Sequence, residues 1–185
     1  FVNYFILILF FILSIIFPVS SFSNDELISN LQSGGNIVFI RHALAPGSGD
    51  PNNIDLNDCR TQRNLSEEGI NQSKKIGELF IENNIPIDKV LSSEWCRCKD
   101  TARYAFKNYK TFHGLNSFYD EKFYKFKEKQ ILDLKTYINN WDSKKNLILI
   151  THYVVIYELL NLAVSSGELI VTKKNLELIG RIKTK

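Results

Sequence analysis

The sequence predicts an α/β fold, a three-layer α/β/α sandwich built on a mostly parallel central sheet. Apolar runs at 36–40 and 146–150 are typical of strands that are buried on both faces, and 90–91 is expected to form a short strand. Segments with helical spacing separate these runs, and alternating strands and helices favour a parallel sheet. The 185 residues, 44% of them hydrophobic, are enough for one core, and no repeat, linker or low-complexity tract divides them.

The first half of the chain supplies three helices and two of the strands. A short helix over 25–31 carries acids in its first turn and stops at two glycines. The strand at 36–40 follows, and a long polar loop then runs to Asp58. Ser66 and the two glutamates after it are typical of a helix start, and an Asn-Asn pair with a proline ends this second helix by residue 86. The strand at 90–91 leads into a third helix over 95–106.

The second half begins with a stretch that has no clear period. Residues 108–130 are rich in aromatics and lysines, and we predict an irregular excursion over the sheet. The remaining elements are a helix over 131–141, a buried strand over 146–150, a helix over 154–162, and a hairpin of 168–172 with 176–182.

The amino-terminal segment predicts export. The first 17 residues are almost wholly apolar, and a proline followed by small residues ends this run. This layout predicts a secretory signal peptide over 1–23 and a folded domain over 24–185, in the periplasm or outside the cell. The alternative is a membrane anchor over 1–19, because the run is only slightly shorter than the ~20 residues of a spanning helix.

Two of the buried strands end in a histidine, and two arginines stand nearby in the predicted sheet, one beside the first histidine and one just after a third strand. His42 follows Arg41, His152 ends the strand at 146–150, and Arg97 comes just after the strand at 90–91. Parallel strands bring these ends to one edge of the sheet, where ligands bind. Guanidinium groups bind phosphate oxygens in a bidentate manner, and a neutral imidazole can form a covalent intermediate with phosphorus. The four residues therefore predict a pocket for a phosphoryl group.

Charge and ligand types narrow the partners to a small phosphorylated substrate. The net charge of +3 comes without a long basic run, so nucleic acid is not expected. A zinc site is disfavoured because arginines, and no third ligand, accompany the two histidines. We expect no metal and no other cofactor, and membrane contact only if residues 1–19 remain as an anchor.

Four motifs occur in a characteristic order along the chain. They are Arg-His-Ala at 41–43, Leu-Ser-x-x-Gly-x-x-Gln at 65–72, Ser-Ser-x-x-x-Arg-Cys-x-x-Thr-Ala at 92–102 and Thr-His at 151–152. This series resembles the histidine phosphatase superfamily, which has a phosphoglycerate-mutase-like fold and an Arg-His-Gly signature. The alanine at position 43 replaces the glycine of that signature.

The resemblance implies that 24–185 is a histidine phosphatase domain. His42 would be the nucleophile that becomes phosphohistidine, and Arg41, Arg97 and His152 would hold the phosphate oxygens. Arg63 is a further candidate contact. The implied activity is metal-independent hydrolysis of a phosphomonoester or phosphoramidate. The alternatives are a phosphotransferase or mutase on the same scaffold and a non-catalytic module that binds a phosphorylated ligand.

The general acid of the family has no direct counterpart. Ser117 stands where many members carry a glutamate, and Tyr153 stands where others carry an aspartate after the second histidine. Asp120 and Glu121 are the candidate proton donors. A missing acid favours substrates with good leaving groups, such as phosphoramidates or aryl esters, because these need less protonation in the transition state.

Three cysteines, Cys59, Cys96 and Cys98, permit at most one intramolecular disulfide. Cys96 and Cys98 are too close on one helix to pair easily, so Cys59 is expected to pair with one of them. Cys96 is the favoured partner, because Cys98 occupies the position at which the family has a small alanine in the core. A bridge over ~40 residues is expected to stabilise the fold by about 3–4 kcal/mol.

Overall fold

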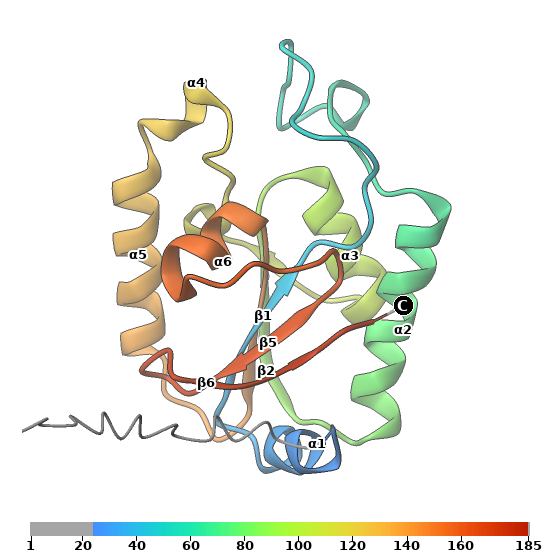
Figure 1. Cartoon of the computed structure of the whole chain (residues 1–185), viewed down its shortest axis with the longest axis vertical. Helices are drawn as coiled ribbons and strands as arrows, with labels where there is room; N and C mark the ends of the chain where they lie inside the picture. The colour runs from blue at the N-terminus through green and yellow to red at the C-terminus, as the bar shows by residue number, and fades with distance from the viewer. Residues whose placement is uncertain (1–23, 185) are drawn as a thin grey trace, which may run out of the picture.

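The computed structural model describes residues 24–184 (Figure 1). The signal peptide or anchor predicted over 1–23 therefore lies outside the described residues. Within the described part, no helix is both long and apolar enough to cross a membrane.

A six-stranded sheet forms the centre of the fold, with strand order β3-β2-β4-β1-β5-β6. The first four strands in this order run parallel, and the β5–β6 hairpin adds two antiparallel strands beside β1. The predicted mostly parallel sheet is therefore confirmed. The strands are β1 (Ile37–Arg41), β2 (Ile87–Ser92), β3 (Lys110–Thr111), β4 (Asn146–Thr151), β5 (Leu169–Thr172) and β6 (Leu178–Ile182).

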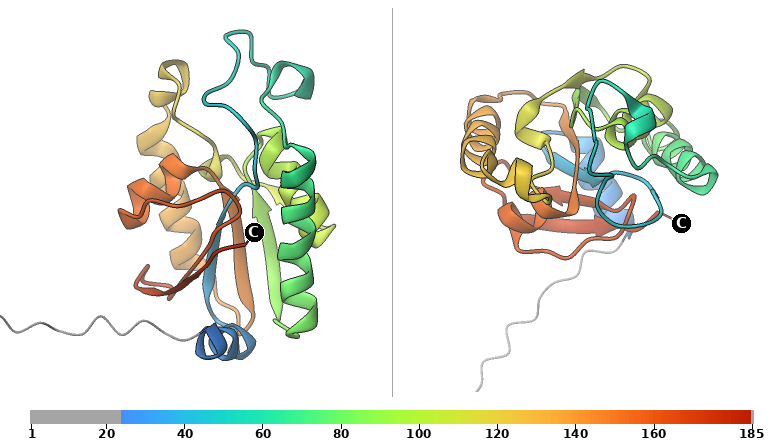
Figure 2. Two further views of the ribbon diagram at one scale, coloured as in Figure 1. Left: turned by 45° about the vertical axis from the view of Figure 1, so that its right-hand side comes forward. Right: turned by 90° about the horizontal axis from the view of Figure 1, so that it is seen from above.

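Helices cover both faces of the sheet, which confirms the three-layer sandwich. Figure 2 shows α2 and α3 on one face and α5 and α6 on the other. Side chains of β1 alternate between the two cores, since Val38 and Ile40 face one cluster while Ile37 and Phe39 face the other. The helices are α1 (Asn24–Ser33), α2 (Glu67–Glu82), α3 (Cys96–Phe106), α4 (Glu121–Tyr124), α5 (Lys127–Asn140) and α6 (Tyr153–Leu160), with 3-10 turns at Cys59–Thr61 and His113–Leu115.

Local chemistry explains where individual helices begin and end. The Ser66 hydroxyl accepts a hydrogen bond of 3.1 Å from the Gly69 backbone N–H, so it caps α2 as predicted. Helix α6 ends at Leu160, two residues before the predicted end. The next residue, Asn161, has φ 52°, and this left-handed conformation stops the helix.

The prediction of an irregular excursion over 108–130 is wrong in part. This stretch contains the edge strand β3, a 3-10 turn, helix α4 and the first turn of α5. Strand β3 pairs through only two residues, Lys110 with Leu91 and Thr111 with Ser92. A two-residue strand and helices of one turn contain too few residues to show a periodic pattern of apolar side chains.

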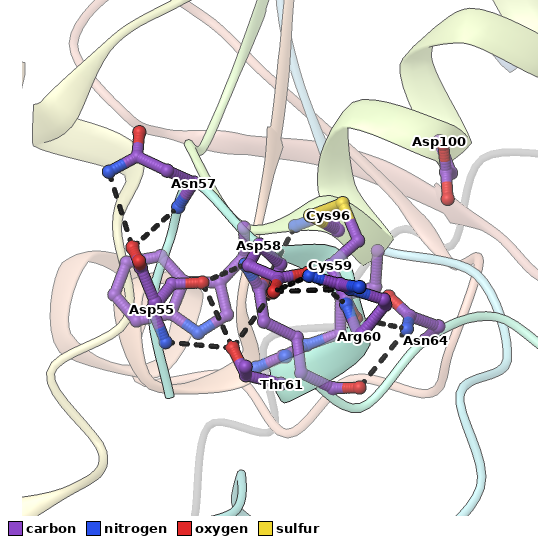
Figure 3. Close-up of a disulfide and its surroundings, with 12 residues drawn as sticks. Asp55, Asn57, Asp58, Cys59, Arg60, Thr61, Asn64, Cys96 and Asp100 are labelled. Carbon is purple, nitrogen blue, oxygen red and sulfur yellow. Dashed lines mark hydrogen bonds and ion pairs between the residues drawn. A yellow bond between two sulfur atoms is a disulfide. The ribbon is translucent and has the colours of Figure 1, made fainter. Parts of the chain in front are cut away.

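A disulfide joins Cys59 to Cys96, the pair favoured from the sequence, and Cys98 is free and buried. It connects the 3-10 turn of the long loop to the first residue of α3 (Figure 3). The Asn64 side chain donates a hydrogen bond of 2.7 Å to the Cys59 carbonyl beside the bridge. The loop is therefore attached next to Arg97.

Removal of this bridge tests its contribution to stability. We expect Cys59→Ser combined with Cys96→Ser to lower the free energy of unfolding by about 3–4 kcal/mol, because the bridge restricts the unfolded chain across a sequence separation of 37 residues. Urea denaturation measures this loss. Mass spectrometry after alkylation of the denatured, non-reduced protein should find one modified thiol, on Cys98, and three modified thiols would contradict the bridge.

Candidate active site

The four residues predicted for a phosphate pocket lie together at the carboxyl ends of the parallel strands. Arg41 is the last residue of β1, Arg97 is in the first turn of α3, and His152 directly follows β4. With His42 they line a cavity of about 190 Å³. The loop after β1 and the segment before α4 extend beyond this edge of the sheet (Figure 1) and complete the cavity wall.

His42 is held with its Nε2 lone pair toward the other site residues. Its Nδ1 lies 2.8 Å from the Ala43 carbonyl oxygen, which can only accept, so Nδ1 carries the proton. The Nε of Arg97 donates to Nε2 at 3.3 Å. Burial, and then the charge of Arg97, lowers the pKa of His42 well below 6.5. The imidazole is therefore neutral, and its unprotonated nitrogen, Nε2, has the lone pair that a nucleophile needs and accepts from Arg97.

His152 is oriented by a chain of side-chain hydrogen bonds. Its Nε2 lies 2.8 Å from the Ser93 hydroxyl oxygen, and that hydroxyl donates in turn to Asn116 Oδ1 at 3.2 Å. This places the proton on Nε2 and leaves Nδ1 to face Arg97 Nη2 at 3.5 Å. Burial first, and Arg97 second, lowers the pKa of His152 well below 6.5. The centroids of the His42 and His152 rings are 5.5 Å apart.

Arg97 forms a buried ion pair that the sequence did not predict. Its Nη1 and Nη2 donate to the two carboxylate oxygens of Asp50 at 2.8 and 3.1 Å. The side chains of Arg97 and Asp50 are only 4% and 3% exposed. Burial alone raises the pKa of Asp50, but the hydrogen bonds and charge of Arg97 outweigh it, so the net shift is downward and Asp50 is ionised.

Two further guanidinium groups border the cavity. Arg41 donates to the Val164 carbonyl at 2.7 Å, and its buried Nε has no hydrogen-bond partner within residues 24–184. Arg63 donates to the carbonyls of Ala45 and Gly49 and so holds the loop after β1. Burial lowers the pKa of both groups, which nevertheless remain charged. The cavity wall is therefore rich in positive charge and suits a phosphoryl group.

The two candidate proton donors have different positions. Asp120 lines the cavity and faces Gly49, where an added Cβ would lie 3.8 Å from Asp120 Oδ1. Glu121 is exposed on α4 and does not line the cavity. Ser117 and Tyr153 also line the cavity. They occupy the two positions at which members of the histidine phosphatase superfamily carry a carboxylic acid. Of the two candidates, only Asp120 lines the cavity.

Sequence analysis assigned no role to Asp50 or Ser93. It also assigned none to Gln62 and Gln72, which form hydrogen bonds around the loop after β1. Gln72 accepts from the Leu44 N–H at 3.0 Å, and Gln62 accepts from the Cys96 N–H at 2.9 Å. Ser93 and Gln72 belong to the motifs at 92–102 and 65–72, so these motifs could have identified them as candidate site residues. Asp50 lies in a loop without periodicity, and nothing in the sequence separates it from other surface acids. Residues 24–184 contain no group of three or more His, Cys, Asp or Glu side chains that could hold a metal ion.

A known protein family is similar to part of the chain. Residues 37–115 match the family model of the histidine phosphatase superfamily (branch 1). This stretch contains His42 and Arg97 and ends before His152. No curated protein matches the sequence.

The fold of this chain is similar to that of several solved structures, including the following three. The protein histidine phosphatase SixA complexed with tungstate is 13% identical, with a TM-score of 0.55 over 80% of this chain and 96% of that chain. Phosphoglycerate mutase from Thermus thermophilus is 12% identical, with a TM-score of 0.55 over 81% and 99%. A mutant phosphoserine phosphatase from Entamoeba histolytica, in complex with phosphoserine, is 15% identical, with a TM-score of 0.51 over 79% and 95%. At these identities the likeness shows the fold alone.

The two neutral histidines make stability dependent on pH. Because the pKa values of His42 and His152 are lowered in the folded state, the unfolded chain binds more protons below about pH 6.5. We expect the free energy of unfolding to fall as the pH decreases from about 7 to about 5. Urea denaturation at several pH values measures this. The double variant with His42→Gln and His152→Gln should show a weaker dependence, and an equally steep one would contradict the assignment.

Proposed function

We propose that the protein is a phosphatase that hydrolyses a phosphomonoester or phosphoramidate through a phosphohistidine on His42, without a metal ion. The observation that carries this proposal is the neutral His42 Nε2, which faces the guanidinium of Arg97 in a cavity rich in positive charge. Three of the similar structures carry the name SixA, one as a protein histidine phosphatase and two as putative phosphohistidine phosphatases, which is consistent with a phosphoramidate substrate.

In the first step His42 Nε2 attacks phosphorus and forms an N–P bond, while the bond from phosphorus to the leaving oxygen or nitrogen breaks. Arg41 and Arg97 donate to the phosphoryl oxygens and stabilise their charge. The unprotonated Nδ1 of His152 faces Arg97, so His152 joins them as a donor only when a proton is placed on Nδ1. Preorganised donors of this kind each lower a barrier by about 3 kcal/mol. In the second step water attacks phosphorus and gives a proton to the carboxylate of Asp120, which protonated the leaving group in the first step. The N–P bond breaks, its electron pair returns to His42 Nε2, and inorganic phosphate leaves. The guanidinium groups supply the positive charge that a metal ion supplies in other phosphatases.

Asp120 is the proposed proton donor to the leaving group. Asp120 lines the same cavity as His42 and His152. Other acids of the cavity do not serve this purpose, because Asp50 is ionised and its oxygens are occupied by Arg97. A single donor at the rim suits leaving groups that need little protonation.

We also propose that the protein works outside the cytoplasm. The Cys59–Cys96 disulfide supports this location, because disulfides persist in oxidising compartments and are rare in the cytosol.

Replacement of the nucleophile tests the proposed reaction. We expect the protein to hydrolyse p-nitrophenyl phosphate in the presence of a chelator, and His42→Ala to lower kcat by roughly three orders of magnitude or more. His113→Ala is the matched control, because His113 is paired with Asp133 outside the cavity. Activity that the chelator abolishes would refute the metal-independent mechanism.

Two other outcomes of the same assay would favour the alternative functions. Phosphate binding without hydrolysis would identify a phospho-ligand-binding module. Transfer of the phosphoryl group to an added alcohol in preference to water would identify a phosphotransferase or mutase.

Leaving-group dependence tests the role of Asp120. We expect Asp120→Asn to lower kcat for glycerol phosphate by about 100-fold, because an alkoxide must be protonated as it leaves. The rate with p-nitrophenyl phosphate should change far less. Glu121→Gln is the control, since that carboxylate lies outside the cavity. If Asp120→Asn leaves the glycerol phosphate rate unchanged, Asp120 is not the donor.

A further inference from the structure

We propose that Asp50 is a positioning residue that aims one edge of the Arg97 guanidinium at the phosphoryl group. This inference rests on the proposed function of the cavity as a phosphate pocket. It assigns a second carboxylate to the site, with a task different from that of Asp120.

The contact between Asp50 and Arg97 uses only one edge of the guanidinium. Nη1 donates to Oδ1 at 2.8 Å and Nη2 donates to Oδ2 at 3.1 Å, so the pair is bidentate and end-on. A guanidinium has a second edge, formed by Nε and the other proton of Nη2. Asp50 does not contact this second edge.

The second edge of Arg97 faces both histidines. Its Nε lies 3.3 Å from His42 Nε2, and its Nη2 lies 3.5 Å from His152 Nδ1. A phosphoryl oxygen bound at this edge would lie beside the nucleophilic nitrogen. Because Asp50 and the phosphoryl group occupy different edges, Asp50 orients Arg97 without competing for the substrate.

Asp50 is itself rigidly held. Its Oδ1 accepts from the Arg63 backbone N–H at 3.0 Å, and its Oδ2 accepts from Trp95 Nε1 at 3.1 Å. Each carboxylate oxygen therefore has two donors, and the side chain is 3% exposed. The Arg63 side chain also donates to the Gly49 carbonyl, next to Asp50, at 2.9 Å. A support with this many contacts can fix the angle of the Arg97 guanidinium.

The substitution Asp50→Asn tests the proposal with little change in shape. The amide keeps one acceptor oxygen and replaces the other with an NH2 donor that faces a donor of Arg97, so the bidentate pair is lost and the guanidinium is no longer fixed at both nitrogens. We expect kcat/KM to fall roughly 10- to 100-fold, the range typical when a supporting partner of a reacting group is lost. The factor should be the same for p-nitrophenyl phosphate and glycerol phosphate, and inorganic phosphate should bind more weakly by calorimetry.

Asp58→Asn is the matched control. Asp58 lies in the same loop and pairs with Arg60, whose side chain is 89% exposed. Its loss should leave kcat/KM and phosphate affinity unchanged. A double-mutant cycle provides the second readout: Asp50→Asn should have little further effect on phosphate affinity in an Arg97→Lys background, because Asp50 acts through Arg97.

Specific results would overturn the proposal. Tighter phosphate binding by Asp50→Asn would mean that Asp50 competes with the substrate. A much larger loss with glycerol phosphate than with p-nitrophenyl phosphate would identify Asp50 as the proton donor. Equal losses in both Arg97 backgrounds would indicate a structural role alone.

The failure of the proposed function can be told apart from these results. If the wild-type protein binds phosphate but hydrolyses no ester, the proposed phosphatase function fails, and the phosphate-affinity cycle still decides the role of Asp50. If the wild-type protein binds no phosphate, both proposals fail.

Discussion

The buried charge of Arg97 is the constraint on which the rest of the site depends. A guanidinium that is 4% exposed must be compensated, and removal of one partner from such a pair costs about 3–5 kcal/mol. Asp50 provides the compensation from a loop that lies far away in sequence. Burial, and then the same guanidinium, lowers the pKa of both histidines, and Arg97 also donates to His42. One cation therefore helps to keep His42 neutral and pairs with the carboxylate that holds the loop.

The sheet places this cation where it can act. Strands β1, β4 and β2 are parallel neighbours, so the residues after them meet at one edge. Helix α3 begins at the same edge, which brings Arg97 between His42 and His152. The Cys59–Cys96 bridge attaches the loop one residue before Arg97. The catalytic geometry thus combines a rigid sheet edge with a loop that is fastened to it at several points.

For the proposed reaction, the cavity offers a nucleophile and positive charge but a single candidate acid. His42 is neutral, and three guanidinium groups line the cavity proposed for the phosphoryl group. Ser117 and Tyr153 occupy the two positions where the resembling family carries a carboxyl group, and Asp120 stands at the rim. The guanidinium groups stabilise the charge on the phosphoryl oxygens. The basicity of the leaving group then determines how much that group must be protonated as it departs. The selectivity of the site is therefore expected to depend on leaving-group chemistry.

Patterns within the sequence alone determined the sheet, most helices and the four central site residues. His42 and His152 could be identified because buried parallel strands have continuous apolar sequences, and Arg97 because it follows such a strand. The short elements between 108 and 130 were missed because they contain too few residues for a period. Asp50 was decided by tertiary structure only. Its role comes from contacts with Arg97, Trp95 and Arg63, which are 47, 45 and 13 residues away, and no local pattern encodes such contacts.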